Sequence, residues 1–229
     1  HYAFNRVHSS VSGVGLNVAL ALKTLGHEVR FLTLLGRDPA GQLARSQIEA
    51  YGLLGPGVLD QLSETAQSVI LYDGSGRREI QVDLKDIQEQ SFPLEVFQAA
   101  RSGCDLAVLC NINFTRDLLA PARAAGLTVA TDVHTLRDLN DAYNRDYLAH
   151  ADVLFMSDEG LPEPPPAWAG RVMECYHPQV LVIGAGAMGA WLHTPAGARP
   201  ELVAAVPGRP VVSTIGAGDA LFSAFVHGY

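Results

Sequence analysis

The stretch STIGAGDALFSAFVHGY (213–229) places three small residues and an acid between an apolar run and an amphipathic one. The run VVSTI (211–215) predicts a β-strand, and the spacing of the apolar side chains after it predicts a helix over 217–227. The small residues at 216–218 therefore lie at a helix N-terminus, where free N–H groups and the helix dipole favour an anion. Without large side chains, a phosphate group can reach these amides. The pattern predicts a strand, an anion-binding turn and a helix, as in an α/β protein.

Apolar runs and amphipathic stretches alternate along the rest of the chain. Continuously apolar runs such as LAVLC and VLVIG are typical of strands that are covered on both faces. We therefore expect an α/β layered fold with a mainly parallel sheet. Strands are predicted at 28–35, 68–73, 78–84, 105–112, 127–133, 152–157, 179–185, 189–194 and 211–215. Helices are predicted at 14–25, 39–51, 94–102, 115–125, 140–149 and 217–227.

Two segments depart from this alternation. Residues 68–84 predict a hairpin around the sequence DGSG (73–76), with one polar face, as in a small sheet that projects from the main body. The proline-rich LPEPPPAW (161–168) predicts a stiff surface loop rather than a helix or a strand.

Composition limits the classes of protein that fit. The 229 residues are 48% hydrophobic and 17% charged, enough for one large domain with a sizeable core. The formal net charge of −8, with no basic stripe to offset it, argues against nucleic acid and anionic membranes as partners. There is no apolar run of about twenty residues and no signal-peptide core at the start. Three sparse cysteines without a CxxC pair fit a reducing compartment, so we expect a cytoplasmic protein.

Two further glycine clusters each admit a structural and a functional interpretation. SGVGLNVALALKTLG (12–26) reads either as a loop, a helix and a C-cap glycine, or as a place where a polar ligand approaches the backbone. IGAGAMGAWL (183–192) matches GxGxxG. A strand rather than a helix is predicted after it, so a dinucleotide enzyme is disfavoured and a tight hairpin beside a nucleotide is the better interpretation.

Together these stretches resemble the signatures of the ribokinase-like (PfkB) carbohydrate kinases. STIGAGD (213–219) resembles the DTxGAGD signature, and the glycines and asparagine of 13–36 match the N-terminal signature. GRDPAG (36–41) resembles GxDxxG, and SDEG (157–160) occupies the place of NxxE. The resemblance runs in order along essentially the whole chain. It implies a three-layer α/β/α fold with a mainly parallel central sheet and a small β lid around 68–84. It also implies one domain over 1–229 that is incomplete at both ends.

By this resemblance the protein is an ATP-dependent kinase that transfers the γ-phosphoryl group to a hydroxymethyl group of a sugar or nucleoside. Asp219 is then the catalytic base, with an anion hole beside it. The resemblance implies Mg²⁺ as a cofactor and is compatible with a bound monovalent cation as well. It also makes the lid a candidate homodimer contact. The implied residues are Gly216, Ala217 and Gly218 for the anion hole, Gly13, Gly15, Asn17 and Asn113 for the sugar, Gly186, Gly189 and Ser157 for the nucleotide, and Glu159 for the metal.

The chain also departs from the family pattern. Ser213 replaces the leading Asp of DTxGAGD, and Ser157 and Gly160 replace both named residues of NxxE. These changes favour a second interpretation, a catalytically silent sugar- or nucleotide-binding relative with a regulatory role, whereas Asp219 and the turn before it favour the kinase. His134, which follows Asp132, is either a surface histidine or a substrate contact. Ribose, fructose derivatives, nucleosides and other polyols all remain open as acceptors.

Overall fold

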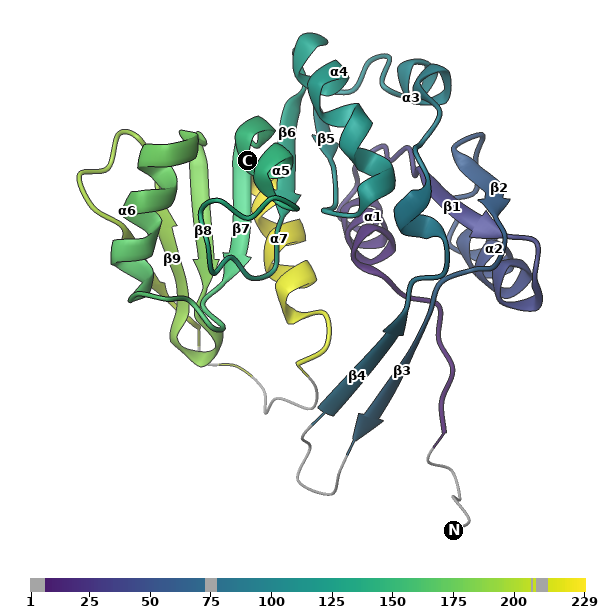
Figure 1. Ribbon diagram of the computed structural model, residues 1–229, viewed down its shortest axis with the longest axis horizontal. Coiled ribbons are helices and arrows are strands. Elements are labelled where there is room, and N and C mark those ends of the chain that lie inside the picture. Colours follow the sequence, from purple (N-terminus) through teal and green to yellow (C-terminus); the bar gives the residue numbers. More distant parts are fainter. Residues whose placement is uncertain (1–6, 73–77, 207, 209–213) are drawn as a thin grey trace. The chain divides into compact units, whose positions relative to one another are not determined.

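The computed structural model of the protein describes residues 7–72, 78–206, 208 and 214–229. The chain divides into two compact units, His1–Gln90 and Ser91–Tyr229, which we describe separately (Figure 1). Ser213 and most of the strand predicted at 211–215 lie outside the described residues, and so does the turn of the predicted hairpin. Within the described residues, no helix combines the length and the apolar character that a membrane span needs. The prediction of a single domain stays a prediction.

The first unit pairs a small parallel sheet with two helices. β1 and β2 run parallel, with Thr33 opposite Val58, and their apolar side chains pack on the two helices. The Asp38 carboxylate accepts the Gly41 N–H at 3.0 Å, and Pro39 follows as the first residue of α2, the start that the sequence predicts. The elements are α1 (Val14–Thr24), β1 (Thr33–Gly36), α2 (Pro39–Ala50), β2 (Val58–Leu62), β3 (Gln67–Tyr72), β4 (Arg78–Asp83) and the 3₁₀-helix η1 (Ile87–Glu89).

The predicted hairpin is present as a two-stranded ribbon. β3 and β4 pair antiparallel, with Gln67 opposite Asp83 and Leu71 opposite Glu79. Apolar side chains are exposed on both faces of the ribbon, because strand residues alternate between faces: Val69 and Leu71 lie on one face, and Ile70, Ile80 and Val82 on the other.

The second unit is a six-stranded sheet in the order β10-β9-β8-β7-β6-β5. β5 to β8 run parallel, and β9 and β10 are antiparallel to their neighbours. The elements are α3 (Leu94–Ala100), β5 (Leu106–Val108), η2 (Asn113–Leu118), α4 (Leu119–Ala124), β6 (Thr128–Asp132), α5 (Arg145–His150), β7 (Val153–Ser157), α6 (Pro165–Tyr176), β8 (Val180–Gly184), η3 (Gly186–Met188), β9 (Gly189–His193), β10 (Glu201–Ala204) and α7 (Ala217–Gly228).

The central strand β7 is covered on both faces. Phe155 packs on Phe222 and Phe225 of α7, with ring centroids 4.8 and 5.3 Å apart. Leu154 points to the opposite face, because neighbouring strand residues alternate, and it is also fully buried. This layering confirms the predicted α/β class with a mainly parallel sheet.

Several predicted boundaries are wrong. The strand predicted at 28–35 begins only at Thr33, and the one predicted at 105–112 ends at Val108. The segment 161–168 is not wholly a loop, because α6 begins at Pro165. Proline is tolerated in the first turn, where its missing N–H would have no intrahelical acceptor. Trp168 then anchors the helix in the core with 2% of its surface exposed.

Candidate active site

The N-terminus of α7 has the geometry of an anion-binding turn. Gly216 is its N-cap with φ 73°, a left-handed conformation that glycine adopts without strain. The Ala220 N–H donates to the Gly216 carbonyl at 2.8 Å, and the Ala217 N–H donates to the Thr214 carbonyl at 3.2 Å. The Gly218 amide belongs to the first turn, which lacks intrahelical acceptors. Among the described residues, nothing lies within 4 Å of the position that a Cβ on Gly218 would occupy.

Asp219 lies in this first turn. Its Oδ2 is 3.9 Å from the position that a Cβ on Gly216 would occupy, so the carboxylate turns back toward the glycines. Its carbonyl accepts the Ser223 hydroxyl at 2.6 Å. The positive end of the helix dipole stabilises a carboxylate here. An acid and an anion-binding turn thus share one helix end.

Three titratable side chains interact electrostatically: Cys110 after β5, Asp132 at the end of β6 and Asp219 at the start of α7. Asp132 ends β6 with 9% of its surface exposed, and its Oδ1 accepts the His134 N–H at 2.8 Å. Burial raises the pKa of Asp132; His134 lowers it, and the charge of Asp219 raises it further. Burial also raises the pKa of the Cys110 thiol to about 12, with Asp132 and Asp219 adding to the effect. The carboxyl edge of the sheet therefore brings Asp219, Asp132 and Cys110 together, a cluster that the sequence analysis did not predict.

This environment predicts how the thiols react. Reagents attack the thiolate, so at pH 8 the folded protein should be alkylated at the exposed Cys175 and spared at Cys110. A rise from the ordinary value near 9 to about 12 lowers the thiolate fraction about 10³-fold. Peptide mass mapping after brief iodoacetamide treatment measures this, and denatured protein should label at all three cysteines. Equal labelling of Cys110 and Cys175 in the folded state would contradict the assigned environment.

The segment after β5 is held by two tyrosines, one from α5 and one from the turn that precedes it. The Tyr143 hydroxyl donates to the Asn111 carbonyl at 2.9 Å, and the buried Tyr147 hydroxyl donates to the Ile112 carbonyl at 2.6 Å. Asn113, a predicted sugar contact, begins η2, and its Oδ1 accepts the Arg116 Nε–H at 2.9 Å. Because the amide oxygen of Asn113 faces Arg116, the NH₂ group of the same side chain points away from Arg116. The sequence analysis did not predict these two tyrosine hydrogen bonds, because each joins residues more than thirty positions apart.

The predicted nucleotide and metal residues follow β7 and β8 at the same edge of the sheet. Ser157 ends β7 opposite Gly184, and the Asp158 N–H donates to the Gly184 carbonyl at 2.9 Å. Glu159 is exposed, and its N–H donates to the Ser157 hydroxyl at 3.2 Å. A Cβ on Gly184 would lie 3.8 Å from Leu221 of α7. Ser157, Glu159 and the start of α7 thus belong to one region of the second unit.

The two glycines between β8 and β9 differ in role. Gly189 has φ 113°, and a Cβ there would lie 2.0 Å from the Val203 carbonyl oxygen. The close approach of β10 therefore requires glycine at this position whether or not a nucleotide binds. Gly186 has φ 54°, and no atom of the described residues lies within 4 Å of the position of a Cβ there, which leaves space for a ligand beside its backbone.

The remaining predicted site residues lie in the first unit. Gly13 is the N-cap of α1 with φ 143°, and Gly15 lies inside the helix rather than before it. The Asn17 N–H donates to the Gly13 carbonyl at 2.9 Å, and its Oδ1 accepts the Ser12 hydroxyl at 3.2 Å. These contacts fix the first turn of α1 and the orientation of the Asn17 amide.

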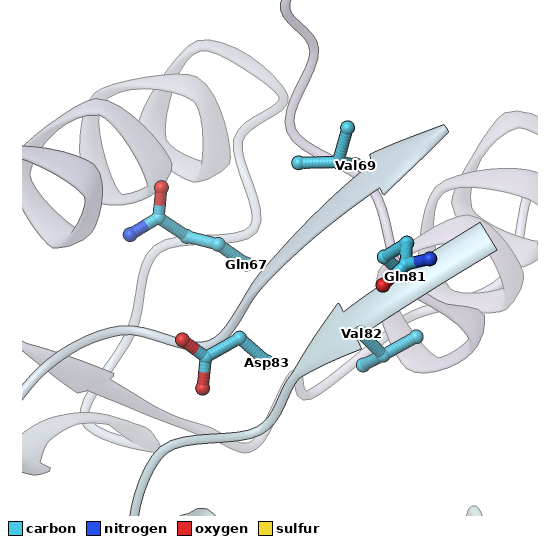
Figure 2. A pocket seen from close by; sticks show the side chains of 5 residues that line it. All are labelled: Gln67, Val69, Gln81, Val82 and Asp83. Carbon is cyan, nitrogen blue, oxygen red and sulfur yellow. The ribbon is translucent and has the colours of Figure 1, made fainter. Parts of the chain in front are cut away.

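Two surface hollows also belong to the first unit. The larger, of about 330 Å³, lies on the ribbon and is lined by Gln67 and Val69 of β3 and by Gln81, Val82 and Asp83 of β4 (Figure 2). The second, of about 210 Å³, lies beside α2 and is bordered by Arg45 and Asp60. Neither contains a predicted site residue, so the chemistry of α7 and not the depth of a hollow locates the candidate site.

An acid beside an open glycine turn, at the carboxyl edge of a parallel sheet, is typical of a phosphoryl-transfer enzyme. The family model of the pfkB family carbohydrate kinases matches residues 1–229, and the chain belongs to this family. The predicted class, an ATP-dependent sugar or nucleoside kinase, is confirmed at this level.

Two characterised relatives match nearly the whole chain. Acarbose 7(IV)-phosphotransferase of Actinoplanes sp. is 28% identical over 230 residues, which cover 100% of this chain and 76% of the relative. ATP-dependent ribose-1-phosphate kinase of Halopiger xanaduensis is 30% identical over 223 residues, which cover 95% of this chain and 72% of the relative. The chain thus spans about three quarters of each relative.

Solved structures confirm the ribokinase-like fold. A microbiome-derived acarbose kinase superposes with a TM-score of 0.81 at 27% identity, over 94% of this chain and 72% of its own. Fructokinase from Xylella fastidiosa, solved with bound ATP, superposes with a TM-score of 0.78 at 23% identity, over 95% of this chain and 73% of its own. The second likeness concerns the fold alone.

Proposed function

We propose that the protein transfers the γ-phosphoryl group of ATP to a hydroxymethyl group of a sugar or nucleoside, with Asp219 as the general base. The observation that supports this most is the position of Asp219 in the first turn of α7, with its carboxylate directed toward Gly216. Asp219 takes the proton of the acceptor hydroxyl as its oxygen bonds to the γ-phosphorus. The bond from that phosphorus to the β–γ bridging oxygen breaks, and ADP leaves. The amides of residues 216–218 stabilise the charge on the transferring group.

The sugar and the nucleotide would contact different residues. We assign acceptor binding to Gly13, Gly15, Asn17 and Asn113, and nucleotide binding to Ser157, Gly186 and Gly189. For Asn113, the contact of its Oδ1 with Arg116 supports a fixed amide that is ready to donate. For Gly186, the open space around its backbone supports close approach of a nucleotide.

Mg²⁺ fits this arrangement through the nucleotide. Within the described part of the chain, no group of three or more His, Cys, Asp or Glu side chains is placed to hold a metal. Mg²⁺ in kinases is usually bound by one or two carboxylates together with substrate phosphates. The exposed Glu159 fits that mode, and the ion would neutralise negative charge on the phosphates.

The ribbon is the candidate contact of a homodimer in a cytoplasmic protein. An isolated two-stranded ribbon is only marginally stable in water, and this one exposes 58% of Val69 and 57% of Val82. Packing one face of the ribbon against a second ribbon would remove the apolar side chains of that face from water. Sedimentation analysis over a range of concentrations tests the dimer, and a monomer throughout that range would refute it.

A panel of acceptors tests the proposed function. ATP consumption should be measured with Mg²⁺ on acarbose, fructose, ribose 1-phosphate, ribose and nucleosides, a panel that includes the substrates in the relatives' names. Turnover on one sugar or nucleoside with formation of its phosphate ester is the expected result. ATP binding without turnover on any acceptor would favour the catalytically silent relative instead.

A further inference from the structure

The loop after β6 is fixed against the end of β7. The His134 carbonyl accepts the Ser157 N–H at 2.6 Å, and its own N–H donates to Asp132. His134 has φ 59°, a conformation that few residues other than glycine adopt, so these two hydrogen bonds hold the loop in an unusual path. Two residues later, Leu136 is fully buried. Arg137 thus projects from a rigid support.

The guanidinium of Arg137 lies directly over Gly160. A Cβ added at Gly160 would be 2.7 Å from Nη2, 2.8 Å from Nε and 3.0 Å from Cζ of Arg137. Gly160 also has φ 71°, which disfavours a side chain. The present position of Arg137 therefore requires glycine at 160, the position where the family pattern NxxE has its glutamate.

Across the described residues, Arg137 lacks the ion pair that several arginines of the second unit have. Arg116, Arg123 and Arg171 are paired with Asp146, Asp152 and Glu163. Among the residues that the structure describes, the exposed guanidinium of Arg137 has neither an ion-pair partner nor a hydrogen-bond acceptor.

The neighbourhood of this cation is acidic and belongs to the phosphate-binding edge. Asp158 and Glu159 precede Gly160, and the Asp158 N–H is bonded to Gly184, which approaches Leu221 of α7. A nucleoside triphosphate would add further negative charge to an edge that already holds Asp132 and Asp219, and a cation at this edge would offset that charge. A guanidinium with five donors matches phosphate oxygens in a way that a lone ammonium does not.

We propose that Arg137 binds the polyphosphate chain of the nucleotide, in the space that Gly160 leaves open. The proposal rests on the proposed kinase function and adds a residue to it. In this proposal the guanidinium of Arg137 occupies the place from which the side chain of the NxxE glutamate would extend. The chain thus lacks the glutamate and has a cation that contacts the phosphates directly.

Calorimetric titration with ATP tests the proposal. Arg137→Gln should weaken ATP binding about 10-fold or more, in keeping with a charge-assisted hydrogen bond, and Arg137→Lys should lose less. Inorganic tripolyphosphate should follow ATP, whereas adenosine should bind as it does to the wild type. The matched control is Arg199→Gln. It removes the same charge from the β9–β10 connection, at the other end of the sheet, because the end of β9 pairs with the start of β8.

A second variant reaches the same contact from the other side. Gly160→Ala should displace the guanidinium and weaken ATP binding, and the loss should not add to that of Arg137→Gln, because both remove one interaction. ATP affinity within twofold of the wild type in Arg137→Gln, or an equal loss of adenosine binding, would overturn the proposal. If the wild type turns over a carbohydrate while Arg137→Gln binds ATP normally, only this inference fails. If the wild type binds ATP but turns over no acceptor, the proposed kinase activity fails, and ATP titration still decides the role of Arg137.

Discussion

Replacing Asp219 with asparagine is expected to lower kcat by about 10²–10⁴-fold, the usual cost of removing a general base. Asparagine has nearly the same shape but cannot accept the acceptor's proton as a carboxylate does. The Ser223 hydroxyl bonds the Asp219 carbonyl rather than the side chain, so this contact is kept. We therefore expect the KM for ATP and the free energy of unfolding to change little. Steady-state kinetics on the acceptor found in the panel measure the effect.

The matched control removes an equivalent charge at a distance. Asp105 is exposed and directly precedes β5, at the amino end of the parallel strands, so Asp105→Asn should leave kcat unchanged. If Asp219→Asn keeps kcat within a fewfold of the wild type, Asp219 is not the base. A loss of kcat together with a large loss of stability would show a structural effect instead, which urea denaturation of both variants distinguishes.

Replacing Phe222 with alanine is expected to lower the free energy of unfolding by about 3–5 kcal/mol, as for other buried aromatic residues. Phe222 is only 1% exposed, and its ring packs on Phe155 at 4.8 Å. This contact attaches α7 to the central strand and thereby positions Asp219 at the helix start. Activity should fall along with stability, because total stability is commonly only about 5–15 kcal/mol.

The neighbouring residue provides the control on the same helix. Leu221 is 38% exposed, so Leu221→Ala should cost below about 1 kcal/mol. Phe222→Leu, which keeps most of the apolar volume, should restore part of the loss. Equal destabilisation by Phe222→Ala and Leu221→Ala in urea denaturation would show that the aromatic contact does not attach the helix as described.

Much of the second unit could be predicted from local pattern. The apolar runs at 127–133, 152–157 and 179–185 became β6, β7 and β8 with their ends shifted by about one residue. The helix at 217–227 is α7, and its N-cap Gly216 adopts a left-handed conformation, which glycine does without strain. Such features depend on periodicity and on the conformational freedom of single residues, which a sequence states directly.

Edge strands and the proline-rich helix were not predicted. β2 and β10 are short, and β10 is exposed along its length, so they carry little apolar signal and exist because a neighbouring strand offers hydrogen bonds. α6 begins inside a run of prolines because the burial of Trp168 outweighs the local preference for a loop. Both outcomes depend on partners that are distant in sequence.

The sequence by itself determined the succession of most strands and helices along the second unit, the glycine turn at 216–218 and the acid beside it, through patterns that act over a few residues. Only the tertiary structure decided that Asp132 and Cys110 meet near Asp219, and that Arg137 rests on Gly160. Asp132 and Asp219 are separated by more than eighty residues, and Arg137 and Gly160 by more than twenty. Such pairs come together because parallel strands align their carboxyl ends along one edge, a consequence of packing that no local pattern records.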